Sequence, residues 1–129
     1  MQPLQLGYIV LIVEDLDRAL AFYTGLLGLA ASHRSGGYAQ LVTGPTRLSL
    51  YTREAMAATL DCELEAPTRA APGFEIGFVV DDVDAAWSEA VASGAEAVRE
   101  PFDRFWGQRH GYLRDPDGHL IELVQNQPS

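Results

Sequence analysis

The segment from Pro101 to Tyr112, PFDRFWGQRHGY, concentrates aromatic rings beside arginine side chains. Its members are Phe102, Phe105, Trp106 and Tyr112 with Arg104 and Arg109. Aromatic walls bind planar or extended ligands through a large buried area, and they attract a cationic ligand to the face of the ring. The alternative is structural, because such rings can also cover an open sheet edge or a dimer interface. The segment therefore indicates either a stacking surface for a ligand or a covering for the fold.

A single carboxylate interrupts an apolar run near the C-terminus. Glu122 stands in HLIELV, where Ile121 and Leu123 alternate with it and are expected to pack under a helix. A carboxylate on the opposite sheet face needs a partner. The sequence leaves three candidate partners for Glu122: an arginine such as Arg109 or Arg114, a cationic ligand, or a metal ion.

Composition narrows the class of partner. Lys plus Arg number 9 against 18 Asp plus Glu, a formal net charge of −9. This charge repels nucleic acid and anionic lipid and would concentrate cationic ligands, although acidic surfaces commonly serve solubility alone.

Cys62 is the only cysteine, so we expect a reducing cytoplasm and no disulfide framework. The short apolar run near the N-terminus is followed by an acidic pair, which predicts a strand rather than a signal peptide or membrane span.

The chain repeats one pattern twice. YIVLIVEDLDRALAFY from Tyr8 aligns with EIGFVVDDVDAAWSEA from Glu75. Each copy has a strand rich in β-branched and large apolar residues, then an acidic pair, then an amphipathic helix. The repeat predicts two modules with the same order of elements.

Both predicted helices carry signals at their ends. Asp15 and Asp82 are placed to cap exposed N–H groups, and Gly28 and Gly94 to close the last turn. The apolar face consists of Leu16, Ala19, Leu20, Tyr23 and Leu27 in the first helix, and of Val83, Ala86, Trp87 and Val91 in the second.

More strands follow each helix. YAQLVTG and TRLSLYT surround Gly44-Pro45, while HGYLRD and HLIELVQ flank the turn DPDG. The predicted class is α+β, in one domain over 1–129. A first βαβββ module covers 1–52, a linker with a short helix covers 53–73, and a second βαβββ module covers 74–129.

These motifs resemble the vicinal-oxygen-chelate superfamily of glyoxalases, bleomycin-resistance proteins and extradiol dioxygenases. VEDLDRALAFYTGLLGL resembles its opening strand-to-helix signature, and WGQRHGYLRDPDGHLIEL resembles its closing hairpin. The matches cover nearly the whole chain, and their order and duplication make the resemblance specific. It implies two curved mixed-sheet half-barrels that enclose a cleft, a homodimer, and a binding groove bordered by the aromatic segment.

Many members of the resembled family bind a divalent metal ion through the first and last strands of each module. The corresponding positions are Tyr8, Ser49, Glu75 and Glu122. The resemblance leads us to expect histidine, glutamine or glutamate at such sites. Alternative roles stay open: Tyr8 as an aromatic core residue, Ser49 as a small residue that leaves room, and Glu75 as a solvated carboxylate.

None of the three histidines matches this ligand pattern. His33 falls in a Gly/Ser-rich loop, His110 stands beside Gly111, and His119 follows the DPDG turn. Nickel, zinc and ferrous iron favour imidazole in mixed sites. We therefore expect no cofactor. The alternative is a harder divalent metal ion, such as magnesium or manganese, held by Glu75 and Glu122.

The leading hypothesis is a small-molecule-binding protein without a transition-metal centre, which sequesters a cationic or aromatic antibiotic. Its predicted ligand-binding residues are Tyr8, Ser49, Glu75, Phe102, Trp106, Arg109 and Glu122. One alternative is a divalent-metal-dependent enzyme, a glyoxalase-like lyase or isomerase or a dioxygenase relative, in which Glu75 or Glu122 also moves a proton. Another is an interaction module for a partner protein. We expect a small-molecule ligand and a homodimer, and neither nucleic acid nor membrane as a partner.

Overall fold

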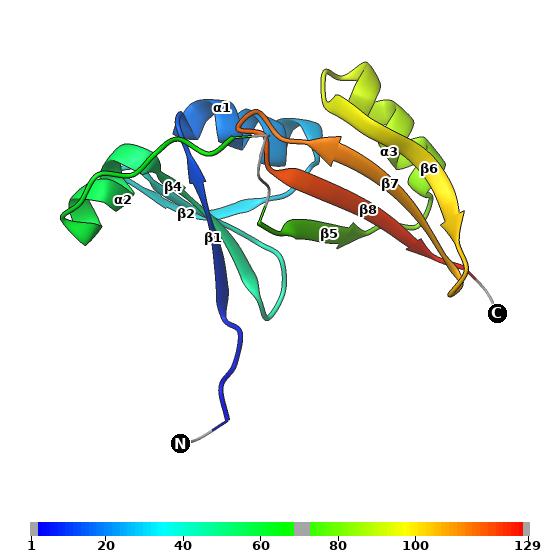
Figure 1. The fold of residues 1–129 in the computed structure, drawn as a ribbon, viewed down its shortest axis with the longest axis horizontal. Coiled ribbons are helices and arrows are strands. Elements are labelled where there is room, and N and C mark those ends of the chain that lie inside the picture. Colours follow the sequence, from blue (N-terminus) through cyan, green and yellow to red (C-terminus); the bar gives the residue numbers. More distant parts are fainter. Residues whose placement is uncertain (1–2, 69–72, 128–129) are drawn as a thin grey trace. The chain divides into compact units, whose positions relative to one another are not determined.

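The computed structural model describes residues 3–68 and 73–127. The chain divides into two compact units, Met1–Pro67 and Thr68–Ser129, so the division falls inside the predicted linker 53–73. Each unit contains a four-stranded mixed sheet that is not closed (Figure 1). The α+β class and the repeated βαβββ order are confirmed.

The first unit begins with strand β1 (Tyr8–Val13) and helix α1 (Leu16–Leu20), which continues into the π-helix η1 (Ala21–Leu26). Strands β2 (Ala31–Ser35), β3 (Tyr38–Leu41) and β4 (Arg47–Thr52) follow. The sheet order is β1-β4-β3-β2, and β1 runs parallel to β4. Helix α2 (Arg53–Leu60) contacts β4 and β1 and thus belongs to this unit.

The second unit repeats the plan. Strand β5 (Glu75–Val79) leads to helix α3 (Val83–Ala92), followed by β6 (Glu96–Arg104), β7 (Gln108–Arg114) and β8 (Leu120–Asn126). The sheet order is β5-β8-β7-β6, and β5 runs parallel to β8. Helix α3 lies along one face of this sheet, in contact with β6, β7 and β8 (Figure 1).

The predicted helix ends are confirmed. The Asp15 side chain accepts a hydrogen bond from the Arg18 N–H, and Asp82 accepts one from the Ala85 N–H. Gly28 and Gly94 have φ angles of 80° and 111°, the left-handed backbone that glycine adopts without steric cost. The same local signals thus begin and end a helix in each module.

The first helix differs from the prediction in its second half. The Leu27 N–H donates to the Phe22 carbonyl, five residues earlier, so the regular helical spacing is interrupted. Leu16, Ala19 and Tyr23 are buried as predicted, but Phe22 is buried too and Leu27 is only half-buried. The extra residue in the turn rotates the chain after Phe22 and moves Leu27 away from the core.

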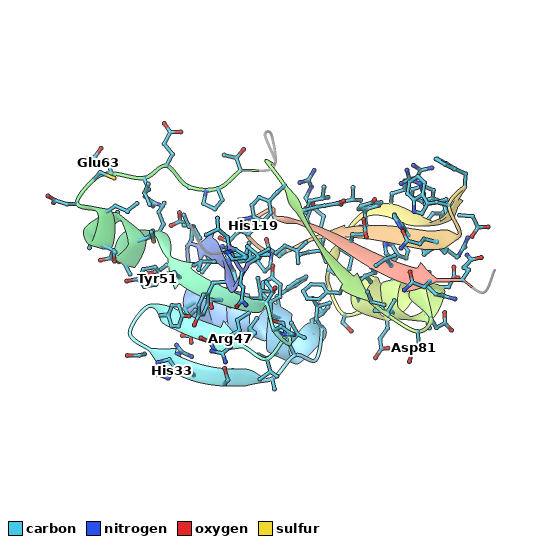
Figure 2. The ribbon with its side chains drawn as sticks, turned by 90° about the horizontal axis from the view of Figure 1, so that it is seen from below. His33, Arg47, Tyr51, Glu63, Asp81 and His119 are labelled. Atoms are coloured by element: carbon cyan, nitrogen blue, oxygen red, sulfur yellow. The ribbon has the colours of Figure 1, made fainter. Side chains whose placement is uncertain are left out.

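Two strands lie where the sequence analysis located none. His33 is on strand β2, not in a loop (Figure 2). Every residue of β2 is exposed, so the polar segment ASHRS carries no apolar alternation to reveal it. Strand β6 contains Pro101 and its register with β7 shifts twice, which hides its pattern as well.

Candidate functional site

The second sheet has one face covered by α3 and one open face. On the covered face, Leu113, Ile121 and Leu123 are buried, and the Trp87 indole donates to the Tyr112 carbonyl at 3.0 Å. Because side chains alternate along a strand, the neighbouring residues of β7 and β8 point the other way. The open face carries the following side chains: Glu75, Phe102, Arg104, Gln108, His110, Tyr112 and Glu122. We call this group the second-sheet site.

Two carboxyl groups meet in this site. Tyr112 pairs with Glu122 in the sheet register, and its hydroxyl donates to Glu122 Oε2 at 3.3 Å. Glu75, on the neighbouring strand β5, lies near enough to Glu122 for the charge of Glu122 to raise its pKa. Gly77 lies opposite Glu122, and a Cβ there would come within 3.1 Å of Glu122 Oε1. The bare backbone at Gly77 therefore leaves room for the Glu122 carboxyl group.

The proximity of these groups changes their proton affinities. Although Glu75 is an exposed residue, partial loss of water around its carboxyl group raises its pKa, and the negative charge of Glu122 raises the pKa further. Burial and the charges of Glu75 and Glu122 also raise the pKa of Tyr112, while Arg104 acts in the opposite direction on both groups. Glu75 therefore keeps its proton to higher pH than an isolated glutamate does.

His110 connects this pair to the aromatic segment. Its Nδ1 lies 3.3 Å from the Tyr112 hydroxyl and 3.6 Å from Glu122 Oε2, and its Nε2 lies 3.0 Å from Gln108 Oε1. The Trp106 indole, which can only donate, is 2.7 Å from the same Gln108 oxygen. That oxygen is thus an acceptor, so His110 Nε2 carries a hydrogen. Nδ1 then faces the Tyr112 hydroxyl and the Glu122 carboxylate.

Aromatic rings surround the imidazole. The Phe102 centroid lies 6.4 Å from that of His110 and 6.3 Å from that of Tyr112. The Trp106 ring is 6.0 Å from His110 on another side. His110 is consequently only 5% exposed, whereas Trp106 keeps 47% of its surface accessible. The site combines a buried polar chain with an accessible ring.

Three predicted site residues, Glu75, Phe102 and Glu122, lie in the second-sheet site, and Trp106 lies beside it in the turn between β6 and β7. Arg109 is not among them, because it alternates onto the α3 side of β7. There it forms two hydrogen bonds with the Asp84 carboxylate, at 3.0 and 2.9 Å, and one with Asp103 at 3.2 Å. These carboxylates raise the pKa of Arg109 and hold its guanidinium in place. Its predicted role in ligand binding has no support from this position.

The arginine partner considered for Glu122 is not found. Arg109 is held by Asp84 and Asp103, and Arg114 lies 3.5 Å from Glu96. Glu122 contacts a tyrosine, an imidazole and a second carboxyl group instead.

Tyr8 and Ser49 belong to the first unit. Ser49 is fully buried on β4, and its hydroxyl lies 2.8 Å from that of Tyr38 on β3. Tyr8 is 55% exposed at the start of β1, so the alternative of an aromatic core residue is not supported. The hydroxyl of Tyr51, two residues after Ser49, lies 2.9 Å from that of Thr59 on α2. The ligand-binding roles of Tyr8 and Ser49 stay predictions.

Four residues of the second-sheet site were not predicted as site residues: Arg104 on β6, and Gln108, His110 and Tyr112 on β7. The three residues of β7 alternate along the strand, so they face the same side as Glu122. The period-two spacing was visible in QRHGY, but only the pairing of β7 with β8 shows which side it faces.

The possible metal-binding side chains in the described ranges do not fit a transition-metal centre. Residues 3–68 and 73–127 contain no group of three or more His, Cys, Asp or Glu side chains that could hold a metal ion. Ser49 and Glu122 already have hydroxyl partners, Tyr38 and Tyr112. We therefore derive no chemical step through a metal, and the expectation of no cofactor stays a prediction. None of the helices in the described ranges is long and apolar enough to cross a membrane.

Comparisons with known proteins agree with this architecture. A family model described as the Glyoxalase/Bleomycin resistance protein/Dioxygenase superfamily matches residues 5–123. YraH of Bacillus subtilis is 33% identical over 95% of this chain and 98% of its own length. A probable lactoylglutathione lyase of Vibrio cholerae is 28% identical over 89% of this chain and 86% of its own. The crystal structure of a glyoxalase-related enzyme from Fulvimarina pelagi matches with a TM-score of 0.83 at 23% identity, covering 98% of this chain and 89% of that one. The chain belongs to the glyoxalase/bleomycin resistance protein/dioxygenase superfamily.

Proposed function

We propose that this protein binds a small organic molecule at the second-sheet site. The observation that carries the proposal is the convergence of Glu75, Glu122, Tyr112 and His110 beside the accessible ring of Trp106. A few polar groups that converge next to apolar and aromatic walls are typical of small-molecule sites. Membership of the superfamily supports such a role, but a shared fold does not identify the ligand.

An aromatic ligand fits this arrangement, as the hypothesis of antibiotic sequestration requires. A planar compound would stack on Trp106 or Phe102 and hydrogen-bond to the Tyr112–Glu122 end. We propose sequestration without a transition metal as the leading role. The homodimer, the cytoplasmic location and a part in antibiotic resistance stay predictions from the sequence.

The test is a thermal-shift screen of planar, drug-like compounds, followed by titration calorimetry of the compounds that stabilise the protein. A ligand in excess raises the melting temperature in proportion to its preference for the folded state. Glu122→Gln should weaken binding of such a ligand. Glu89→Gln is the matched control, because Glu89 is exposed on α3, on the far side of the sheet. Equal affinity in both variants would contradict the placement of the site.

A second candidate is an enzyme of the lyase or isomerase type. The chain of contacts from His110 through Tyr112 to Glu122 and Glu75 favours it, because such a chain can take up and return a proton beside a carbonyl group. The similarity to a probable lactoylglutathione lyase points to a concrete substrate to test.

The second candidate is tested by following lactoylglutathione turnover by chromatography, with the wild-type protein and with Glu122→Gln. Turnover that disappears in Glu122→Gln and survives chelation supports proton transfer by these residues alone. Turnover that disappears after chelation supports a divalent metal ion on Glu75 and Glu122. A wild-type protein without turnover leaves the binding role as the proposed function.

A further inference from the structure

We propose that the ligand of the second-sheet site carries an oxyanion, a carboxylate or a phosphate, which binds the guanidinium groups of Arg99 and Arg104 on strand β6. The proposal rests on the proposed small-molecule function and adds the chemical class of the ligand.

The guanidinium groups of Arg99 and Arg104 lie over the rings of Phe102 and Trp106, an arrangement that we call the ladder. The Arg99 Cζ lies 3.4 Å from the centroid of Phe102. The Arg104 Cζ lies 5.3 Å from the same ring and 4.1 Å from the Trp106 ring. Stacking on rings holds a guanidinium plane in position while its N–H edges stay available for hydrogen bonds. The ladder therefore presents oriented donors along the edge strand.

These donors have no acceptor among the described residues. Throughout residues 3–68 and 73–127, the guanidinium groups of Arg99 and Arg104 have neither a hydrogen bond nor an ion pair with a carboxylate. Their neighbours Arg109 and Arg114 both have carboxylate partners. In a chain with 18 Asp plus Glu and only 9 Lys plus Arg, two guanidinium groups without an ion pair in the described ranges are available to an anionic ligand.

The ladder adjoins the polar end of the site. In the sheet register, Phe102 pairs with His110 and Arg104 pairs with Gln108. The positive charge of Arg104 also acts on Glu75 and Tyr112, and it lowers the pKa of each against the other causes that raise it. A single ligand can thus place its oxyanion at the ladder, its flat body beside the accessible Trp106 ring, and a polar group near Tyr112.

The proposal reverses the sign of the ligand charge predicted from composition. The net charge of −9 favoured a cationic ligand. Screening limits the influence of distant surface charges to roughly 10 Å at ordinary salt concentrations. The charged groups in direct contact with the ligand therefore decide its sign, and at the ladder these are the guanidinium groups of Arg99 and Arg104. Of the carboxylates on β6, Glu96 faces Arg114 and Asp103 is bonded to Arg109.

The experiment uses the full chain and a matched series of probes on one ring system. Naphthoate and naphthyl phosphate are anionic, naphthamide is neutral, and naphthylmethylammonium is cationic. We expect one or both anions to bind at least about tenfold more tightly than naphthamide, since charge-assisted hydrogen bonds to a guanidinium exceed neutral ones. The cation should bind more weakly than naphthamide.

Arg99→Gln and Arg104→Gln should each remove most of that tenfold preference, and the double variant should remove it entirely. The matched control is Arg34→Gln, which makes the same charge change at an exposed ion pair with Asp17 and should keep the preference. Thermal unfolding verifies that each variant is folded, and the two single variants test the same point independently.

Three results would overturn the inference. Equal affinity for the anions and naphthamide would exclude an oxyanion site while leaving small-molecule binding intact. An equal loss of preference in Arg34→Gln would assign the effect to overall charge. Binding of no probe, whatever its charge, would contradict the proposed function together with this inference.

Discussion

The carboxyl pair gives a prediction whose size and pH dependence follow from the structure. Replacing Glu75 by glutamine removes one of two like charges on neighbouring strands. Like charges directly opposite each other destabilise a sheet by up to about 1 kcal/mol. Glu75 is opposite Leu120 and therefore diagonal to Glu122, and it is exposed to water, so we expect about 0.5 kcal/mol. Glu75→Gln should therefore stabilise the protein at pH 7 by about 0.5 kcal/mol, equivalent to about 2 °C in Tm.

The gain should depend on pH in one direction. The folded state raises the pKa of Glu75 above its ordinary value of 4.5, so at intermediate pH the folded protein holds a proton that the unfolded chain has lost. The wild-type protein therefore loses stability relative to the variant as the pH rises from 4.5 through the raised pKa. Below pH 4.5 both states of the wild-type protein are protonated, and the advantage of Glu75→Gln should vanish.

Thermal or denaturant unfolding between pH 4 and 8 measures the difference in stability between the wild-type protein and Glu75→Gln. Glu89→Gln, at an exposed position of helix α3, is the control. NMR titration of the Glu75 carboxyl group in Glu122→Gln adds an independent check, since its pKa should fall toward 4.5 when the neighbouring charge is removed. The same gain at every pH would refute the reasoning, because it would show an effect of strand packing rather than of charge.

Three further substitutions test the scaffold of the site by denaturant unfolding. Gly111→Ala should destabilise by about 1–2 kcal/mol, because its Cβ would lie 2.9 Å from the Trp87 ring; unchanged stability would mean that α3 can shift away freely. Asp82→Ala should cost about 1 kcal/mol through loss of the α3 cap, whereas Asp82→Asn should cost much less; equal costs would argue against a capping role. Tyr112→Phe should lower the free energy of unfolding by about 1 kcal/mol, because it removes the hydroxyl between the His110 imidazole and the Glu122 carboxylate. Tyr8→Phe, at an exposed ring, should leave this free energy almost unchanged. Similar values for the two variants would show that the Tyr112 hydroxyl contributes little.

Much of the fold could be predicted from local patterns. The aligned strand-to-helix segments, the caps Asp15 and Asp82 and the closing glycines Gly28 and Gly94 all reflect preferences of short stretches of chain. Strand β2 was missed because an exposed edge strand has no apolar alternation. The π-helical turn after Leu20 was missed because helical spacing in the sequence does not reveal one inserted residue.

The sequence by itself determined which kinds of side chain are available, because carboxylates, rings and guanidinium groups are properties of single positions. Of the predicted ligand-binding residues, Glu75, Phe102 and Glu122 lie on the second sheet and Trp106 in the turn between β6 and β7, whereas Tyr8 and Ser49 lie in the first unit. Only the tertiary structure decided what these groups meet. The register of β7 on β8 places His110 and Tyr112 against Glu122, and the same alternation turns Arg109 toward Asp84. Pairing between strands is a long-range property: a shift of one residue would exchange the two faces, so the neighbours of each side chain are fixed only when the sheet forms.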